Sequence, residues 1–144
     1  MAEPDISFGN KEESDYVRRR LIEYNAGHVP EHLSSRYEEL HLALKDDAGR
    51  VVGGLLAVLC WNWIEVVILW VEESLRGQGH GARLLRRIEE IAGEQDCAFI
   101  KLNTFSFQAP GFYRKHGYEE VAVFEDAPTG SNHYYFRKSI RSVF

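Results

Sequence analysis

Two patterns of hydrophobic residues alternate along the chain and predict a mixture of helices and strands. Some segments repeat apolar residues at the spacing of an amphipathic helix, whereas others are short runs rich in apolar and β-branched residues. The helical pattern covers Lys11–Asn25, Gly79–Gly93 and Gln108–His116, and a short helix is predicted at His32–Tyr37. The predicted strands are Asp5–Phe8, Glu39–Lys45, Val51–Trp61, Ile64–Val71, Ala98–Thr104, Tyr118–Phe124 and His133–Lys138. This order of elements predicts an α/β fold.

The connections between the predicted strands are marked by composition. Asp46–Gly49 is typical of a hairpin turn, and the proline and glycine of Glu125–Asn132 indicate the loop of a closing hairpin. The apolar runs Val51–Trp61 and Ile64–Val71 are nearly continuous. We therefore expect these two strands to be covered on both faces.

A glycine-rich turn, Arg76-Gly77-Gln78-Gly79-His80-Gly81, separates an apolar strand from an amphipathic helix. Glycine permits the backbone bends and close approach that such a turn requires. The first N–H groups of a helix have no partner within the helix, and together with the helix dipole they form an anion site. Arg76 adds a positive charge at its mouth. The turn is therefore interpreted as a cradle for a pyrophosphate-bearing cofactor.

Other glycine cradles fit this turn less well. A P-loop requires Lys-Ser or Lys-Thr after its last glycine, whereas Ala82 and Arg83 follow here. Gly77, Gly79 and Ala82 satisfy the looser dinucleotide fingerprint, but the next strand ends without an acidic residue for a ribose hydroxyl. An ordinary strand-to-helix turn is the simplest alternative, although it seldom requires this many glycines beside an arginine.

Two sequence blocks together resemble the GNAT acyltransferase superfamily. Arg76, Gly79 and Gly81 match its Q/R-x-x-G-x-G/A signature. The later block Gln108–Tyr118 resembles the N-x-x-A-x-x-F-Y-x-x-x-G-F element, with Ser106 standing where many members carry asparagine. The resemblance implies a single domain over residues 1–144, with a mixed, mostly antiparallel central sheet of about six to seven strands flanked by helices. It also implies a splayed strand pair that receives coenzyme A.

Acetyl-CoA is the co-substrate that this resemblance implies. Its pyrophosphate would lie on the backbone amides of the glycine turn, and its pantetheine arm would pair with the strand that ends at Val71. The expected cofactor-binding residues are Leu69, Trp70, Val71, Arg76, Gly77, Gln78, Gly79, His80, Gly81, Ala82, Asn103 and Ser106.

The implied reaction is acetyl transfer to a primary amine by direct attack in a ternary complex. An alkylammonium with a pKa of about 10 must lose a proton before it attacks. Glu65, an acid inside an apolar strand, is the candidate base, although a strand-end acid facing solvent and a water chain remain alternatives. Tyr113 stands where the family carries the tyrosine that faces the thioester sulfur, so it is the candidate acid. A core aromatic is its alternative interpretation.

Composition limits the partners. The chain has 144 residues and a net charge of −5, which argues against nucleic acid as a partner.

Cys60 and Cys97 lack metal or redox spacing and are expected to be buried thiols of a cytosolic protein. No signal peptide or membrane-spanning segment is expected, so the predicted location is cytoplasmic. His28 and His32 have Pro30 between them and no evident third ligand, so no metal site is expected.

The acceptor is expected to be a small-molecule amine, such as a polyamine, an aminoglycoside-like antibiotic or an amino acid. A protein or peptide amine, and an acyl-CoA-binding module without turnover, remain alternatives. The resemblance assigns acceptor choice to two loops, Asn25–Tyr37 and Glu125–Asn132, and Trp61 and Trp63 could wall the pocket. Exposed aromatic candidates in Tyr134–Phe136 indicate a possible homodimer.

Overall fold

The computed structural model describes residues 2–140, and the chain divides into two units. One unit extends to Arg36 and the other begins at Tyr37. Each unit is described by itself. Neither contains, within residues 2–140, a helix that is long and apolar enough to cross a membrane. The single domain over residues 1–144 stays a prediction.

The first unit contains one helix, α1 (Lys11–Ala26), among its described residues. Asn10 caps it: its side chain accepts a hydrogen bond from the Glu13 amide at 2.8 Å, and the Glu13 carboxylate accepts one from the Asn10 amide at 2.9 Å. This reciprocal capping box satisfies two amides that the first helical turn leaves unpaired. None of the residues of α1 is buried.

Two predictions in this unit are wrong. Asp5–Phe8 forms no strand, because no neighbouring strand pairs with it. His32–Tyr37 is not a helix: hydrogen bonds between residues three apart, such as those from the Leu33 amide to the Pro30 carbonyl and from the Arg36 amide to the Leu33 carbonyl, make turns, and Tyr37 already begins a strand. These three-residue hydrogen bonds never continue into a helical ladder.

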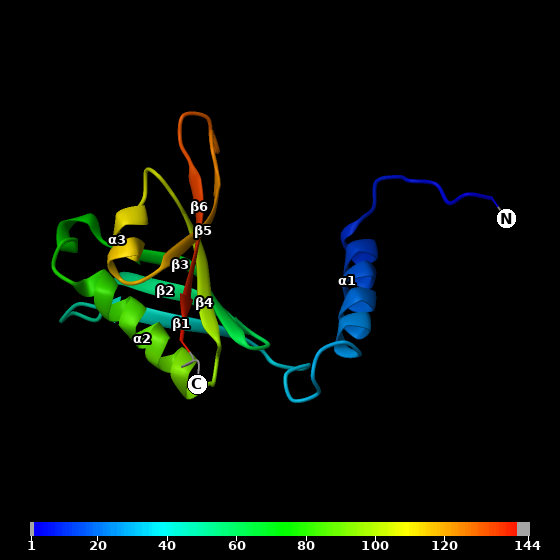
Figure 1. Ribbon diagram of the computed structural model, residues 1–144, viewed down its shortest axis with the longest axis horizontal. Helices are drawn as coiled ribbons and strands as arrows, with labels where there is room; N and C mark the ends of the chain where they lie inside the picture. Colours follow the sequence, from blue (N-terminus) through cyan, green and yellow to red (C-terminus); the bar gives the residue numbers. More distant parts are fainter. Residues whose placement is uncertain (1, 141–144) are drawn as a thin grey trace. The chain divides into compact units, whose positions relative to one another are not determined.

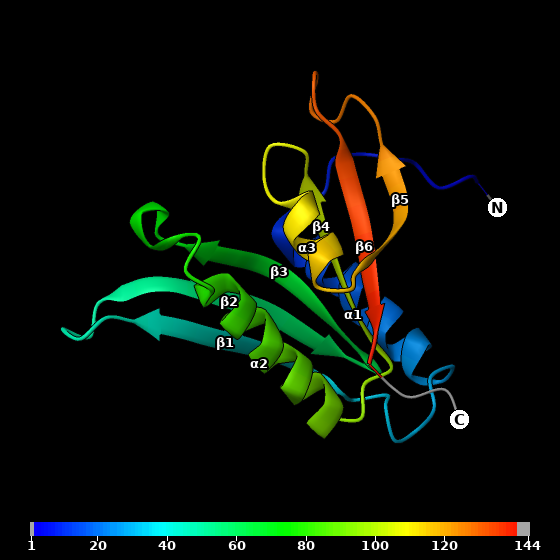
Figure 2. The same ribbon diagram turned by 60° about the vertical axis from the view of Figure 1, so that its left-hand side comes forward.

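The second unit is a six-stranded sheet with helices (Figures 1 and 2). The strands follow one another in space in the order β1-β2-β3-β4-β6-β5, and β3 with β4 is the parallel pair. The mixed, mostly antiparallel sheet is therefore confirmed. The elements of this unit are β1 (Tyr37–Lys45), β2 (Val51–Cys60), β3 (Trp63–Val71), the 3-10 turn η1 (Glu73–Leu75), α2 (His80–Glu94), β4 (Phe99–Phe105), α3 (Pro110–Lys115), β5 (Glu119–Phe124) and β6 (His133–Ser139).

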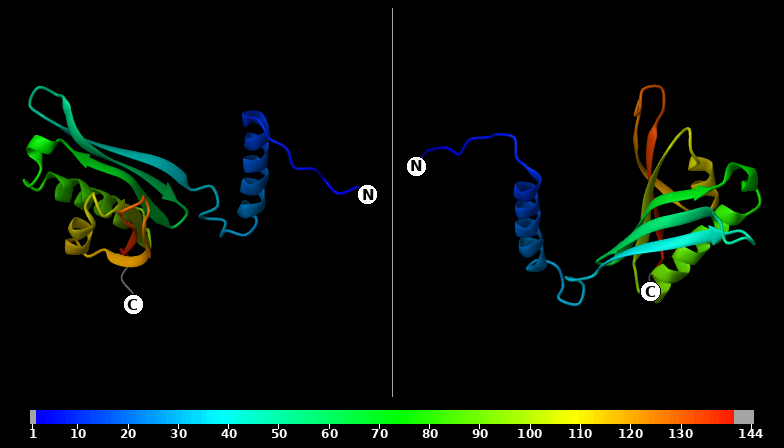
Figure 3. Two further views of the ribbon diagram at one scale, coloured as in Figure 1. Left: turned by 90° about the horizontal axis from the view of Figure 1, so that it is seen from above. Right: turned by 180° about the vertical axis from the view of Figure 1, so that it is seen from behind.

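Helix α2 lies along one face of β1–β3 (Figure 3). It buries an apolar stripe composed of Leu84, Leu85, Ile88 and Ala92. On β2 the alternate residues Leu55, Ala57 and Leu59 are buried with it, whereas Leu56 remains 39% exposed. The expectation that β2 and β3 are covered on both faces is therefore wrong for this unit. The apolar residues of their second face are exposed, and a nearly continuous apolar run in the sequence does not distinguish the face that is buried from the face that is not.

A β-bulge at Val67 directs the course of β3. Val66 pairs with Ala57 and Ile68 with the adjacent Leu56, so Val67 has no partner of its own on β2. Such an extra residue reverses the alternation of side chains and bends the strand. The parallel pairing of β3 with β4 ends at this point, with Val66 opposite Leu102. The two strands then diverge, as Figure 2 shows, which confirms the splayed pair.

The closing hairpin of β5 and β6 lies beyond β4. Phe136 is only 1% exposed, so its predicted exposure is wrong, whereas Tyr134 and Tyr135 are half-buried. Alternation along β6 places Phe136 in the core beside Tyr113, with ring centroids 6.1 Å apart. The homodimer stays a prediction.

Candidate active site

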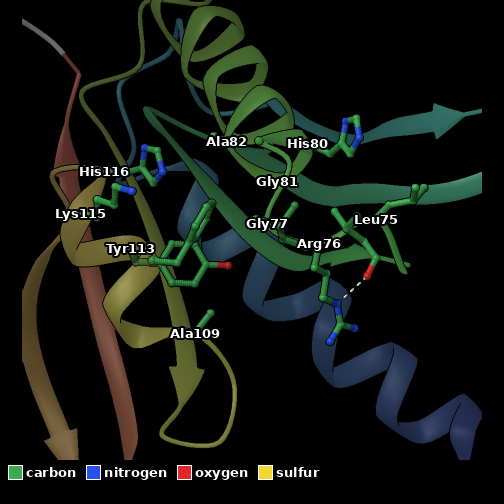
Figure 4. Close-up of a pocket in the computed structure, with 14 residues that line it drawn as sticks. Leu75, Arg76, Gly77, His80, Gly81, Ala82, Ala109, Tyr113, Lys115 and His116 are labelled. Atoms are coloured by element: carbon green, nitrogen blue, oxygen red, sulfur yellow. Dashed lines mark hydrogen bonds between the residues drawn. The ribbon is translucent and has the colours of Figure 1, made fainter. Parts of the chain in front are cut away.

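The glycine turn and α3 face each other across a cavity of about 430 Å³ (Figure 4). The turn supplies one wall, the diverging end of β3 the floor, and α3 the opposite wall. The residues that line it are Leu69, Val71, Leu75, Arg76, Gly77, Gly79, His80, Gly81, Ala82, Ala109, Phe112, Tyr113, Lys115 and His116.

The glycines of the turn have the conformation that an anion cradle requires. Gly77 and Gly79 have φ values of 77° and 87°, in the left-handed region that favours glycine. Gly79 is also the N-cap of α2, so the first free amides of that helix begin here. A Cβ atom at either glycine would meet no atom within 4 Å. Backbone conformation therefore explains these glycines, and the space beside them is open to a ligand.

The first cavity has a cationic rim. Arg76, His80, Lys115 and His116 line it, and no acidic residue of residues 2–140 does so. Arg76 is held in place, because its Nε donates to the Val71 carbonyl at 2.8 Å. Figure 4 shows the His80 imidazole pointing away from the side where Lys115 and His116 lie. This arrangement suits a ligand with several phosphate groups.

A second cavity of about 550 Å³ opens between the diverging strands. Its walls come from the end of β3, the end of β4 and the turn that follows β4. The lining residues are Val66, Val67, Ile68, Leu69, Trp70, Val71, Arg76, Asn103, Thr104, Phe107, Gln108, Ala109 and Tyr113. Both cavities share Leu69, Val71, Arg76, Ala109 and Tyr113, so they meet beside α3.

Tyr113 lies at this junction. Its side chain is 7% exposed, and it packs against Phe112 and Phe136. Its hydroxyl has no hydrogen-bond partner among residues 2–140, and Figure 4 shows it directed toward the side of the cavity where Arg76 lies. Burial raises the pKa of Tyr113 to about 12. The hydroxyl therefore keeps its proton across the neutral range and can donate it to a ligand.

Tyr118 shows what a structural tyrosine looks like in the same core. It is 3% exposed, and its hydroxyl donates to Glu89 Oε2 at 2.8 Å. Lys138 Nζ lies 3.2 Å from the same oxygen and also donates to the His116 carbonyl at 3.0 Å. This network joins α2 to β6 and the end of α3. The contrast with the unpartnered hydroxyl of Tyr113 separates a packing role from an available donor.

Glu65 lies on β3 just before the strands diverge. It is half-buried, and it is paired in register with Val58 on β2 and Lys101 on β4. Cys60 lies on the same face of the sheet, because its register partner Trp63 is two residues from Glu65, and burial raises the pKa of its thiol. Glu65 does not line either cavity, but its neighbour Val66 lines the second one.

These features agree with a comparison of the chain with known proteins. The family model of the Acetyltransferase (GNAT) family matches residues 7–118. The chain belongs to the GNAT family of acetyltransferases. This GNAT acetyltransferase is therefore an acyltransferase.

Individual relatives agree with this assignment. The chain is 41% identical over 85 residues to a blasticidin-S acetyltransferase of Streptomyces morookaense, a match that covers 58% of this chain and 62% of that relative. An acetyltransferase from Bacillus cereus has a similar crystal structure, with a TM-score of 0.90 and 38% identity, covering 94% of this chain and 97% of that one. An aminoglycoside 6′-N-acetyltransferase complexed with coenzyme A shares the fold, with a TM-score of 0.65 and 21% identity over 79% of each chain.

Acetyl-CoA is the co-substrate of this GNAT acetyltransferase. The first cavity fits it, because the open space beside Gly77 and Gly79 and the cationic rim suit its phosphates. The β3 edge that faces the splay is free of β4 beyond Val66. However, the Val71 carbonyl already accepts from Arg76, so backbone pairing with the pantetheine arm stays a prediction that would rest on Leu69 and Trp70.

The structure brings most of the predicted cofactor residues of this GNAT acetyltransferase to the two cavities, but not all of them. Gln78 and Ser106 line neither cavity. The Gln78 side chain donates through Nε2 to the Ser74 carbonyl at 3.4 Å, and the Ser106 hydroxyl accepts from the Asn132 backbone amide at 3.0 Å. Asn103 lines the second cavity and bonds to His133 Nε2 at 2.9 Å. Their contacts with the co-substrate stay predictions.

Sequence reasoning missed several residues that line the cavities, among them Lys115, His116 and Phe107. Lys115 and His116 end the Phe-Tyr-Arg-Lys-His run and line the first cavity, and a basic pair after a motif tyrosine was the available signal. Phe107 lines the second cavity from the turn after β4. It had no signal in the sequence, because a phenylalanine near a strand end is ordinarily interpreted as part of the core.

Proposed function

We propose that this protein transfers the acetyl group of acetyl-CoA to the primary amine of a small molecule, by direct attack in a ternary complex. The observation that carries the proposal is the unpartnered hydroxyl of Tyr113, at the junction of a cavity suited to phosphates and a second cavity open to an acceptor. The thioester would lie at this junction, where the amine can reach it and Tyr113 can donate to the departing sulfur.

The residues around the junction favour direct attack. No cysteine or serine in residues 2–140 lines either cavity, and the Thr104 hydroxyl donates to Gln108 Oε1 at 3.0 Å. Within the described residues the lining therefore offers neither a thiol nor a serine hydroxyl, the usual nucleophiles of a covalent acetyl-enzyme. Initial-rate plots with both substrates varied should therefore give intersecting rather than parallel lines.

Glu65 is proposed to take the proton of the amine through a water molecule. Its carboxylate belongs to the strand pair that borders the second cavity but does not line that cavity. A water molecule bridges such a gap at little cost, because a bridged hydrogen bond is enthalpically close to a direct one. Its register partner Lys101 places its Nζ over the Trp63 ring, 5.0 Å from the ring centroid.

The first test is a thiol-release assay with acetyl-CoA and a panel of amines. Blasticidin S belongs in the panel because a relative is named for it, and an aminoglycoside, a polyamine, an amino acid and a peptide with a free N-terminus complete it. Turnover of a small amine supports the proposal. Turnover of the peptide alone would favour a protein acetyltransferase, and coenzyme A binding without turnover of any amine would favour a binding module.

Replacing Glu65 with glutamine should lower kcat/KM for the best amine roughly tenfold or more at pH 7, because the variant lacks the base. The defect should shrink as the pH rises toward the amine pKa of about 10, because free amine then forms without assistance. The measurement is kcat/KM from pH 6.5 to 9.5. Glu119→Gln is the matched control, since Glu119 is an exposed acid on edge strand β5 and lines neither cavity. If the pH profile of Glu65→Gln equals that of the wild-type protein, the proton of the amine leaves through a water chain without Glu65.

A further inference from the structure

Three aromatic rings form a parallel stack beside the second cavity. Phe105, the last residue of β4, stacks on His133 with centroids 4.2 Å apart and planes 16° from parallel. It also stacks on Phe107, at 5.3 Å and 10°. Phe105 thus contacts both other rings, and Phe107 ends the stack. Phe107 lines the second cavity and remains 63% exposed.

The turn that carries Phe107 is held firmly despite this exposure. Gln108 Oε1 accepts hydrogen bonds from the Phe105 amide and the Thr104 hydroxyl, each at 3.0 Å. Ser106 and Asn132 exchange two further bonds: the Ser106 amide donates to the Asn132 carbonyl, and the Asn132 amide donates to Ser106 Oγ, each at 3.0 Å. These bonds tie the turn to the loop before β6. Phe107 is therefore a large apolar ring presented on a fixed support.

Besides Phe107, the second cavity is lined by apolar side chains of β3 and by the polar Asn103, Thr104 and Gln108, and it offers no acidic residue among residues 2–140. Val67, Ile68 and Trp70 line it, and Arg76 is the one charged residue that does so among residues 2–140. A polyamine or another polycation is ordinarily held by carboxylates, which this lining does not offer. A flat ring would instead bury apolar surface here and could extend the stack.

We propose that Phe107 is a stacking platform that selects acceptor amines carrying a flat aromatic ring close to the amino group. The proposal rests on the acetyl transfer proposed above and names the acceptor class for that same site. The ring of the acceptor would lie on Phe107 as the next layer of the stack, and its amine would extend toward the junction at Tyr113. Phe107 is a specificity residue in this arrangement and takes no part in proton transfer.

The test compares two acceptors that differ only in the ring, 2-phenylethylamine and 2-cyclohexylethylamine. With saturating acetyl-CoA, the wild-type protein should have the higher kcat/KM for the aromatic amine. In Phe107→Leu the ratio of the two kcat/KM values should fall roughly three- to tenfold, the usual size of an aromatic stacking preference. Because both proteins are tested with the same two amines, the difference between the pKa values of the amines affects both ratios equally and does not change the comparison. The change should appear mainly in KM, because stacking holds the substrate and the transition state alike.

Phe124→Leu is the matched control, because Phe124 is a similarly exposed ring, 59%, that lines neither cavity. Its ratio should equal that of the wild-type protein. Equal ratios in the wild-type protein and Phe107→Leu would overturn the platform.

If the wild-type protein acetylates neither amine, the same pair is titrated by calorimetry into the protein saturated with coenzyme A. An aromatic preference that Phe107→Leu removes would support the platform while counting against the proposed transfer to these amines. Equal affinities, or no binding of either amine, would overturn the platform itself.

Discussion

Replacing Tyr113 with phenylalanine should lower kcat about 10²-fold while the Kd for acetyl-CoA barely changes. The phenylalanine ring preserves the packing on Phe112 and Phe136, so only the hydroxyl is lost. That hydroxyl has no partner among residues 2–140, so its removal leaves no buried group unsatisfied. The lost interaction forms chiefly as the sulfur becomes negative, which is why kcat falls and binding does not. Thiol release under saturating substrates and calorimetry with acetyl-CoA measure the two quantities.

Tyr118→Phe is the control that removes a hydroxyl from the same core. Tyr118 donates to Glu89, so its loss should lower the free energy of unfolding by ~1–3 kcal/mol. Its turnover should stay within a few-fold of the wild-type value. Tyr113→Phe should show the opposite pattern, with unchanged stability in urea unfolding and low turnover. Wild-type turnover in Tyr113→Phe would leave Tyr113 as a packing residue.

The pH dependence of Tyr113→Phe follows from the raised pKa. With a pKa of about 12, the phenol stays protonated at every pH at which free amine accumulates. The ratio of wild-type to variant kcat should therefore be constant from pH 7 to 9.5, because the donor does not titrate in that range. Thiols titrate near 8.5, so the hydroxyl stabilises the leaving sulfur chiefly by a hydrogen bond. A ratio that falls steeply in this range would require a different acid.

Replacing Gly79 with valine should weaken coenzyme A binding at least tenfold while the protein remains folded. A φ of 87° is strongly disfavoured for valine, so the turn must change conformation, and the first amides of α2 then no longer point toward the phosphate site. This backbone strain should lower the free energy of unfolding by roughly 1–3 kcal/mol, which a folded domain can tolerate. Calorimetry with coenzyme A measures the affinity, and circular dichroism with thermal melting tests the fold.

Gly93→Val is the control for this substitution. Gly93 lies on the same helix, its φ is not positive, and an added Cβ would meet no atom within 4 Å. Valine has a higher helix propensity than glycine, so stability should be equal or slightly higher. Coenzyme A affinity should not change. Unchanged affinity in a folded Gly79→Val would contradict the cradle.

Local patterns in the sequence were sufficient for most of the second unit. Hairpin strands and helix α2 were predicted within one or two residues of their bounds, because side-chain periodicity depends on neighbouring residues alone. The predictions that failed, Asp5–Phe8 and His32–Tyr37, are short, and Ile6 and Phe8 stay fully exposed. A short segment adopts regular structure only when something packs or pairs with it.

The sequence by itself determined the parts of the site that depend on local backbone chemistry. The glycines of the turn indicated a backbone bend and close approach, the helix after them indicated free amides, and the two motif blocks indicated the family. Tertiary structure alone decided how these parts meet. The bulge at Val67 turns Leu69 and Val71 toward the first cavity, and the splay of β3 from β4 opens the second. It also left the Tyr113 hydroxyl without a hydrogen-bond partner among residues 2–140, whereas the Tyr118 hydroxyl donates to Glu89. Strand register and burial depend on residues far apart in the chain, so no local pattern could have shown them.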